Sequence, residues 1–284
     1  MAIFPVRHRS DCGRSRQHDL RSAPVLRRGF TLVELLIVVA IIVTIIATLL
    51  PAFASVRRSS RVTADLANLR MLQAAHLGYA TDFGGYLADA RLPHGGVDQD
   101  IKESFVTTLK PYYDSAFALR SPIDNSPHWP TSMGGANVPL AGSADAFRVT
   151  SYGLNNFLSR EFSPASAVDP LLATDRLSKV SSPGATVHML LMAETGDYAG
   201  SDHVHVETWG GAQQAAIVAT VQVSTAAAGG LERTGEARSN WSFLDGHAAT
   251  LRFGSTYIDQ SINRFDPSVS GLFDSRTGGT LGSP

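Results

Sequence analysis

Two histidines and a glutamate alternate with valines in the segment His203-Val-His205-Val-Glu207. Successive side chains of a β-strand point to opposite faces, so this alternation would place all three polar side chains on one face. Imidazole nitrogens and carboxylate oxygens are ligands that zinc binds in proteins. The segment therefore predicts a candidate metal site of His203, His205 and Glu207. The interpretation that we favour is a half-exposed strand whose valines face the core, so no metal or other cofactor is predicted here.

A further histidine stands beside a carboxylate in Asp245-Gly246-His247. Such a pair suits acid–base chemistry, although a turn residue next to a strand explains it as well. The sequence contains no nucleophile elbow, phosphate-binding loop or Cys-x-x-Cys motif. We therefore predict that the chain is not an enzyme.

A carboxylate also interrupts an apolar run. Residues 30–50 carry a single charge, Glu34, and as a helix they would span the roughly 30 Å of a bilayer core. A carboxylate within a membrane span costs roughly 2.5 to 3.5 kcal/mol, so Glu34 should have a partner. The neighbouring sequence offers none. Cleavage after Gly29 would free the amino group of Phe30, which could pair with Glu34 of a neighbouring molecule.

Arg27-Arg28-Gly29 followed by Phe30-Thr-Leu-Val-Glu34 resembles the class III signal of type IV prepilins and type II secretion pseudopilins. The resemblance implies that a prepilin peptidase recognises Arg27 and Arg28 near the end of a leader, cuts after Gly29 and methylates Phe30. It further implies that Glu34 guides the packing of subunits into a helical filament. An ordinary signal anchor with an incidental glutamate is the alternative.

The first 29 residues read as a cytoplasmic leader. They hold seven arginines and two aspartates but no apolar run of their own, which a Sec-type leader would need. Positive charge beside the span should hold this end in the cytoplasm and send the C-terminal part across the inner membrane. The only cysteine, Cys12, lies in the leader, so the mature chain should need no disulfide.

The balance of charge argues against nucleic acid as a main partner. The whole chain has 24 basic and 25 acidic residues, a net charge of −1. Removal of the leader's seven arginines and two aspartates leaves 17 basic and 23 acidic residues, a net charge of −6. An acidic mature protein lacks the excess of positive charge that is typical of nucleic-acid-binding proteins.

A long helix is predicted over residues 30–83. Pro51 should bend or loosen it, and apolar residues then recur at helical spacing at Val56, Val62, Leu66, Leu69, Leu72, Tyr79 and Phe83. The opposite, polar face carries Arg57, Arg58, Arg61, Asp65, Asn68 and Arg70, of which the first three could anchor the helix at the membrane surface. Gly84 and Gly85 should end the helix in left-handed conformations.

Residues 84–284 are predicted to form a periplasmic or extracellular globular domain. One or two short helices interrupted at Pro111 are expected in residues 101–119, and residues 271–284 should be a frayed tail. Strands are expected at Val187–Met192, Val204–Trp209, Ala215–Val223, Trp241–Leu244 and Ala248–Phe253. The predicted fold is α+β and pilin-like: a long N-terminal helix, membrane-spanning in its first half and amphipathic in its second, packed on an antiparallel sheet.

Short motifs extend the resemblance. The end of the helix, Tyr79 to Tyr86, is similar to the major-pseudopilin pattern, with Leu87 where that pattern has proline. Residues 151–155 (SYGLN) and 243–247 (FLDGH) are similar to signatures of large pseudopilin-like proteins, with Gly235 where a subgroup has histidine. Family analogy also implies possible calcium binding by loop carboxylates, for which the candidates are Asp82, Asp89, Asp259, Asp266 and Asp274.

The alternation of side chains between the two faces of a strand predicts the register of the last hairpin. A three-residue loop of Leu244, Asp245 and Gly246 would pair Phe243 with His247 and keep the apolar residues of both strands on one face. That loop requires a positive φ at Gly246. We expect the face of Trp241, Phe243, Leu251 and Phe253 to pack on the core, against the lower half of the long helix.

Two functions are compatible with the sequence. The favoured one is a prepilin-like structural subunit, with partners in the prepilin peptidase, other pilin or pseudopilin subunits, the inner-membrane assembly machinery and the lipid bilayer. The alternative is a membrane-anchored periplasmic or surface enzyme, or a metal-binding protein, that uses a prepilin-like anchor and the histidines at 203 and 205.

Overall fold

The computed structural model describes residues 29–94, 101–113 and 119–277. The chain divides into two units, Met1–Ala52 and Phe53–Pro284, and the boundary falls within the first helix. The described α-helices are α1 (Leu32–Asp82), α2 (Phe105–Thr108), α3 (Pro164–Val168), α4 (Ala215–Gln222) and α5 (Phe273–Thr277). The described strands are β1 (Tyr152–Asn155), β2 (Val187–Leu191), β3 (His203–Val204), β4 (Arg238–Phe243), β5 (Ala248–Arg252), β6 (Tyr257–Asp259) and β7 (Ile262–Asn263).

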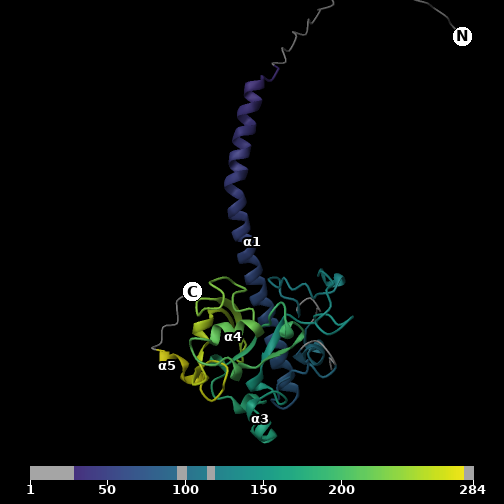
Figure 1. The fold of residues 1–284 in the computed structure, drawn as a ribbon, viewed down its shortest axis with the longest axis vertical. Helices are drawn as coiled ribbons and strands as arrows, with labels where there is room; N and C mark the ends of the chain where they lie inside the picture. Colours follow the sequence, from purple (N-terminus) through teal and green to yellow (C-terminus); the bar gives the residue numbers. More distant parts are fainter. Residues whose placement is uncertain (1–28, 95–100, 114–118, 278–284) are drawn as a thin grey trace, which may run out of the picture. The chain divides into compact units, whose positions relative to one another are not determined.

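Helix α1 is continuous over 51 residues and passes through Pro51 without ending (Figure 1). All residues from Leu32 to Leu50 are exposed. In the described part of the chain, α1 is the one helix long and apolar enough to cross a membrane. The helix predicted over residues 30–83 is confirmed to within two residues at either end.

The second half of α1 packs on the globular unit through the face that its periodicity indicates. Leu69 and Leu72 are fully buried there, and their neighbours Val62, Leu66 and Tyr79 are partly buried. Val56 and Phe83, at the two ends of the predicted face, remain exposed. The helix stops as predicted, because Gly84 and Gly85 have φ values of 65° and 86°.

The prediction that Asp65 lies on the polar, solvated face of this helix is wrong. Its side chain is completely buried. Tyr152 of β1 donates its hydroxyl hydrogen to Oδ1 of Asp65 at 2.7 Å, and the Asn240 amide of β4 donates to Oδ2 at 2.7 Å. Burial raises the pKa of this carboxyl. Asp65 therefore joins the helix to two strands through bonds that only the folded chain provides.

The main sheet has five strands in the order β3-β1-β2-β4-β5. Its neighbours are antiparallel except β1 and β3, which run parallel and pair Leu154 with His203. The predicted α+β fold is confirmed, but the sheet is mixed rather than purely antiparallel. Strands β6 and β7 form a separate two-stranded sheet.

Two hydrophobic clusters form around the main sheet. One cluster combines α1 with strand residues, namely Leu69, Leu72, Ala75, Tyr152, Leu154, Met189, Leu191 and Ala248. The other combines strand residues with α4 and later segments, namely Leu190, Trp241, Phe243, Trp209, Ala219, Phe253, Tyr257 and Phe265. Since adjacent strand residues point to opposite faces, the sheet separates α1 from the second cluster.

The C-terminal hairpin has the predicted register. Trp241 pairs with Ala249, the Phe243 N–H donates to the His247 carbonyl at 2.9 Å, and Gly246 has φ of 105°. Strand β5 begins at Ala248 as predicted and ends at Arg252, one residue before the predicted end. The prediction that the apolar face of this hairpin packs against the long helix is wrong.

Trp241, Phe243, Phe253 and the partly buried Leu251 belong to the cluster that contains α4. The face of the hairpin toward α1 instead carries polar groups, since the Ser242 hydroxyl donates to Oε1 of Gln73 at 3.1 Å.

The strand predicted over Ala215–Val223 is also wrong, because Ala215–Gln222 forms helix α4. The buried residues of α4 are Ala215, Ala216, Ala219 and Gln222, which share one helical face, whereas Ile217 and Val221 are exposed. Two of the β-branched residues that favoured a strand thus point to solvent, while Val218 and Val223 pack on the second cluster. A short apolar run does not distinguish a helix from a strand by itself.

Two smaller predictions are met in part. Of the one or two short helices expected in residues 101–119, the structure describes α2, which is followed by a 3-10 turn, Lys110–Tyr112, that contains Pro111; residues 114–118 lie outside the described residues. The expected frayed tail is ordered at its start, because α5 covers Phe273–Thr277 and the Arg264 guanidinium lies 4.5 Å from the centre of the Phe273 ring. The remainder of the tail, 278–284, lies outside the described residues.

Candidate functional site

The start of α1 holds the residues for which processing and assembly are predicted. Gly29 and Phe30 precede the helix, and the Phe30 side chain is 74% exposed. A Cβ atom added to Gly29 would meet no atom within 4 Å. Nothing in the described structure therefore requires glycine at this position. Arg27 and Arg28 lie outside the described residues.

Glu34 has a partner within its own chain, contrary to the prediction. Its Oε2 atom accepts from the Thr31 backbone N–H at 2.9 Å and from the Thr31 hydroxyl at 2.8 Å. The Glu34 N–H donates to the Thr31 hydroxyl oxygen at 3.2 Å. This arrangement is a capping box, in which the residue before a helix and the third residue of the helix satisfy each other's backbone N–H groups. The spacing Thr-x-x-Glu was visible in the sequence.

A second candidate site surrounds His203 and His205, but the predicted strand does not extend through it. Strand β3 contains only His203 and Val204, and a 3-10 turn follows at Val206–Thr208. The Val206 N–H donates to the side-chain oxygen of Asn156 instead of to a strand. Glu207 is therefore not presented beside the two histidines as a third ligand on one strand face.

Glu207 instead contacts His205 directly. Its Oε1 atom lies 2.9 Å from Nδ1 of His205, while its Oε2 atom accepts from the Asn156 amide at 2.6 Å. The third imidazole at this site is His94, which sequence reasoning missed. The ring centres are 4.9 Å apart for His94 and His203, 4.9 Å for His94 and His205, and 5.0 Å for His203 and His205. The three rings therefore form a nearly equilateral triangle, called here the histidine cluster.

Aromatic rings surround the histidine cluster. Phe162 stacks on the buried His203 ring with centres 3.7 Å apart and an interplanar angle of 12°. Tyr198 lies 4.2 Å from the His94 ring centre. Burial, followed by the neighbouring charges of His203 and His205, lowers the pKa of His94 to about 4. His94 is thus neutral at physiological pH, which leaves a nitrogen lone pair on its ring.

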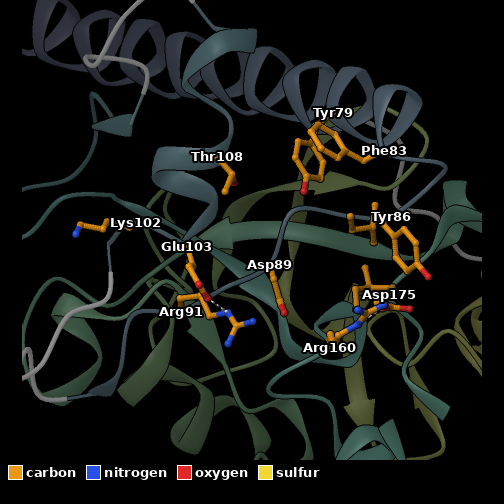
Figure 2. A pocket seen from close by; sticks show the side chains of 12 residues that line it. Tyr79, Phe83, Tyr86, Asp89, Arg91, Lys102, Glu103, Thr108, Arg160 and Asp175 are labelled. Atoms are coloured by element: carbon orange, nitrogen blue, oxygen red, sulfur yellow. Dashed lines mark hydrogen bonds and ion pairs between the residues drawn. The ribbon is translucent and has the colours of Figure 1, made fainter. Parts of the chain in front are cut away.

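A pocket of about 390 Å³ opens near the C-terminal end of α1 (Figure 2). Its two arginines are paired with carboxylates: Nε of Arg160 lies 2.6 Å from the Asp175 carboxylate, and Nε of Arg91 lies 3.7 Å from the Glu103 carboxylate. Tyr79 of α1 and Phe83, which directly follows α1, line one wall. Because these arginines are neutralised within the pocket, it gives no reason to assign a reaction there.

The other chemical candidates lie apart from one another. Asp245 and His247 form a pair in an exposed turn, with Oδ1 and Nδ1 2.6 Å apart. Asp259 and Asp266 accept hydrogen bonds from serines two residues further along the chain. Among the described residues, the histidine cluster is the one group of three or more potential ligands close enough to share a metal ion. Calcium binding by the loop carboxylates stays a prediction.

A comparison with known protein families gives a match at the N-terminal segment of the chain. Residues 26–50 match the family model described as the prokaryotic N-terminal methylation motif. The matched segment includes Gly29, Phe30 and Glu34 and ends directly before Pro51. No curated protein and no solved structure matches the chain.

Proposed function

We propose that this chain, whose residues 26–50 carry the N-terminal signal of type IV pilins and pseudopilins, is a prepilin-like structural subunit. A prepilin peptidase would cleave it between Gly29 and Phe30 and methylate the new amino terminus. The mature chain would then join a type IV pilus or a type II secretion pseudopilus through α1.

The observation that carries this proposal is the position of the signal relative to the helix. The motif covers the start of α1, and the first half of that helix is apolar and exposed from Leu32 to Leu50. Exposed apolar surface of this extent requires either lipid or other helices around it. Before assembly the inner membrane would supply lipid, with the globular domain on the periplasmic side, and in a filament neighbouring subunits would supply helices.

The capping box is compatible with an assembly role for Glu34. The backbone N–H and the hydroxyl of Thr31 both donate to Oε2 of Glu34 in the described structure. A carboxylate can accept about four hydrogen bonds. Oε1 can therefore accept a hydrogen bond from the Phe30 amino group of a neighbouring subunit. Charge-assisted bonds of this kind are stronger than neutral ones.

The test of processing is the N-terminus of the protein extracted from membranes. Sequencing or mass spectrometry should show a chain that begins at methylated Phe30, whereas Gly29→Val should retain the leader. Gly211→Val is the matched control, because a Cβ atom at Gly211 also meets nothing within 4 Å and its φ is not positive. A wild-type chain that keeps its leader in assembled filaments would refute the proposal.

A further inference from the structure

The three histidines of the histidine cluster are close enough together to share one metal ion. One ligand nitrogen from each of His94, His203 and His205 lies within 4.8 Å of the other two. Tetrahedral zinc with bonds of about 2.0 to 2.1 Å needs its nitrogen ligands about 3.3 Å apart. The side chains would have to close by at most about 1.5 Å. His205 and His94 can supply this movement, since both side chains keep some exposure to solvent.

Two carboxylates orient the rings of His203 and His205. Oδ1 of Asp202 lies 3.2 Å from Nδ1 of His203, and Oε1 of Glu207 lies 2.9 Å from Nδ1 of His205. A carboxylate accepts hydrogen bonds, so each Nδ1 donates to its carboxylate and Nε2 is the nitrogen left to bind a metal. This is the arrangement by which metal-binding histidines are usually held, with the second nitrogen bonded to a carboxylate.

Asp202 also fixes the chain that carries His94. Its carboxylate is completely buried and accepts from the backbone N–H groups of Arg91 and Leu92 at 2.9 and 3.0 Å. It accepts from the Ser104 hydroxyl at 2.6 Å as well. One buried side chain thus positions two of the three imidazoles, although they are more than 100 residues apart in sequence.

The buried ring of His203 supplies an independent indication of a ligand. Its side chain is only 1% exposed, and its Nε2 atom has no hydrogen-bond partner among the described residues. A buried polar atom without a partner costs about 1 to 3 kcal/mol. Coordination of a cation by the Nε2 lone pair would remove that cost.

We propose that His94, His203 and His205 bind one zinc ion and leave its fourth position open to water or another exchangeable ligand. Neutral imidazoles favour zinc over calcium or magnesium, which prefer oxygen ligands. Three protein ligands with a fourth open position distinguish exchangeable zinc sites from closed structural ones. The site lies in the globular unit and does not depend on cleavage or assembly at the start of α1.

The test compares metal binding by the full-length chain and its variants, purified in detergent without a polyhistidine tag and stripped with a chelator. Equilibrium dialysis with elemental analysis should show that His94→Ala binds one zinc ion fewer than the wild type. His247→Ala should bind as much zinc as the wild type. It is the matched control because His247 also contacts a carboxylate but lies outside the histidine cluster. Zinc bound elsewhere on the chain would be common to all these proteins.

Two further measurements identify the geometry. Cobalt(II) should give the intense visible bands of four-coordinate metal in the wild type, and azide should shift these bands if the fourth position exchanges. Glu207→Gln should weaken zinc binding by about 10- to 100-fold, as expected for a residue that orients a ligand. Circular dichroism in chelator verifies that each variant is folded. Equal zinc binding by the wild type and a folded His94→Ala variant would overturn the proposal, as would a six-coordinate cobalt spectrum.

Discussion

Thr31 and Glu34 close a reciprocal set of hydrogen bonds at the first turn of α1, with the Thr31 N–H and hydroxyl 2.9 and 2.8 Å from the same carboxylate oxygen. The carboxylate also lies at the positive end of the helix dipole. Glu34 therefore has a local role that is separate from any contact with a neighbouring subunit. The two roles make different demands on the side chain, because capping needs an acceptor oxygen and the subunit contact needs a negative charge.

Glu34→Gln should separate these roles. Glutamine also serves in a capping box, so the variant should insert in the membrane at least as well as the wild type. It lacks the charge that would pair with the Phe30 amine, so its incorporation into filaments should fall, as for Glu34→Ala. Co-expression with the wild type and quantification of both chains in sheared filaments measures this.

Thr31→Val is the complementary variant. It removes the capping hydroxyl, at a typical cost of about 1 kcal/mol to the start of the helix, but retains the carboxylate. Its incorporation should stay close to that of the wild type. If Thr31→Val fails to assemble while Glu34→Gln assembles normally, Glu34 acts through capping and not through its charge.

Tyr152→Phe should destabilise the globular unit by roughly 1 to 3 kcal/mol, because it removes one of two strong donors to the buried Asp65 carboxylate. Denaturant unfolding of the detergent-solubilised full chain measures the effect. Tyr113→Phe is the matched control, since its hydroxyl donates to a neutral backbone carbonyl of Val106 at 2.9 Å. Its loss should cost only about 0.5 to 1.5 kcal/mol. Equal losses in both variants would contradict this expectation.

His76 should make the protein sensitive to mild acid. Burial lowers its pKa from 6.5 to about 4, so between these values the unfolded chain binds a proton that the native chain does not. The stabilising contribution is complete above pH 6.5 and is lost as the pH falls toward 4, by roughly 3 kcal/mol in all. His188, whose ring centre lies 4.5 Å away, has a pKa lowered in the same direction by burial.

The variant His76→Gln keeps a donor for the Ala88 carbonyl, which lies 3.3 Å from Nε2 of His76. Its free energy of unfolding should depend less steeply on pH between 6.5 and 4 than that of the wild type, when both are measured in chelator. His247→Gln, at an exposed turn, is the control for the loss of a histidine as such. An unchanged slope in His76→Gln would show that this histidine is not the source of acid sensitivity.

Gly246→Val should destabilise the hairpin by roughly 1 kcal/mol or more, since a β-branched residue fits poorly at φ of 105°. The cost is conformational rather than steric, because the nearest atom to an added Cβ, Cδ1 of Leu77, is 3.5 Å away. Gly211→Val, in open space without a positive φ, should cost less. Thermal unfolding of the two variants side by side tests this, and equal unfolding temperatures would contradict the explanation.

Local sequence was sufficient for the features that depend on neighbouring residues. The apolar run and its helical continuation predict α1, the signal before it predicts the match at residues 26–50, and side-chain parity predicts the pairing of Trp241 with Ala249. Each of these depends on residues close in the chain, whose spacing is fixed by helix or strand geometry.

Contacts between distant segments decided the rest. The run Ala215–Gln222 is a helix because its alanines pack on the cluster around Trp209 while Ile217 and Val221 stay in solvent. Asp65 is buried because donors from β1 and β4 meet it. In each case the apolar or polar character of the residue was visible, but the surface that it would meet was not.

The histidine cluster shows this division most clearly. The sequence by itself determined that His203 and His205 are two residues apart, and from a strand's alternation it placed Glu207 beside them as a ligand. Folding ends the strand at Val204 and turns Glu207 toward Nδ1 of His205. Only the tertiary structure supplies His94, because the buried carboxylate of Asp202 binds the backbone just before it and the ring of His203 at the same time.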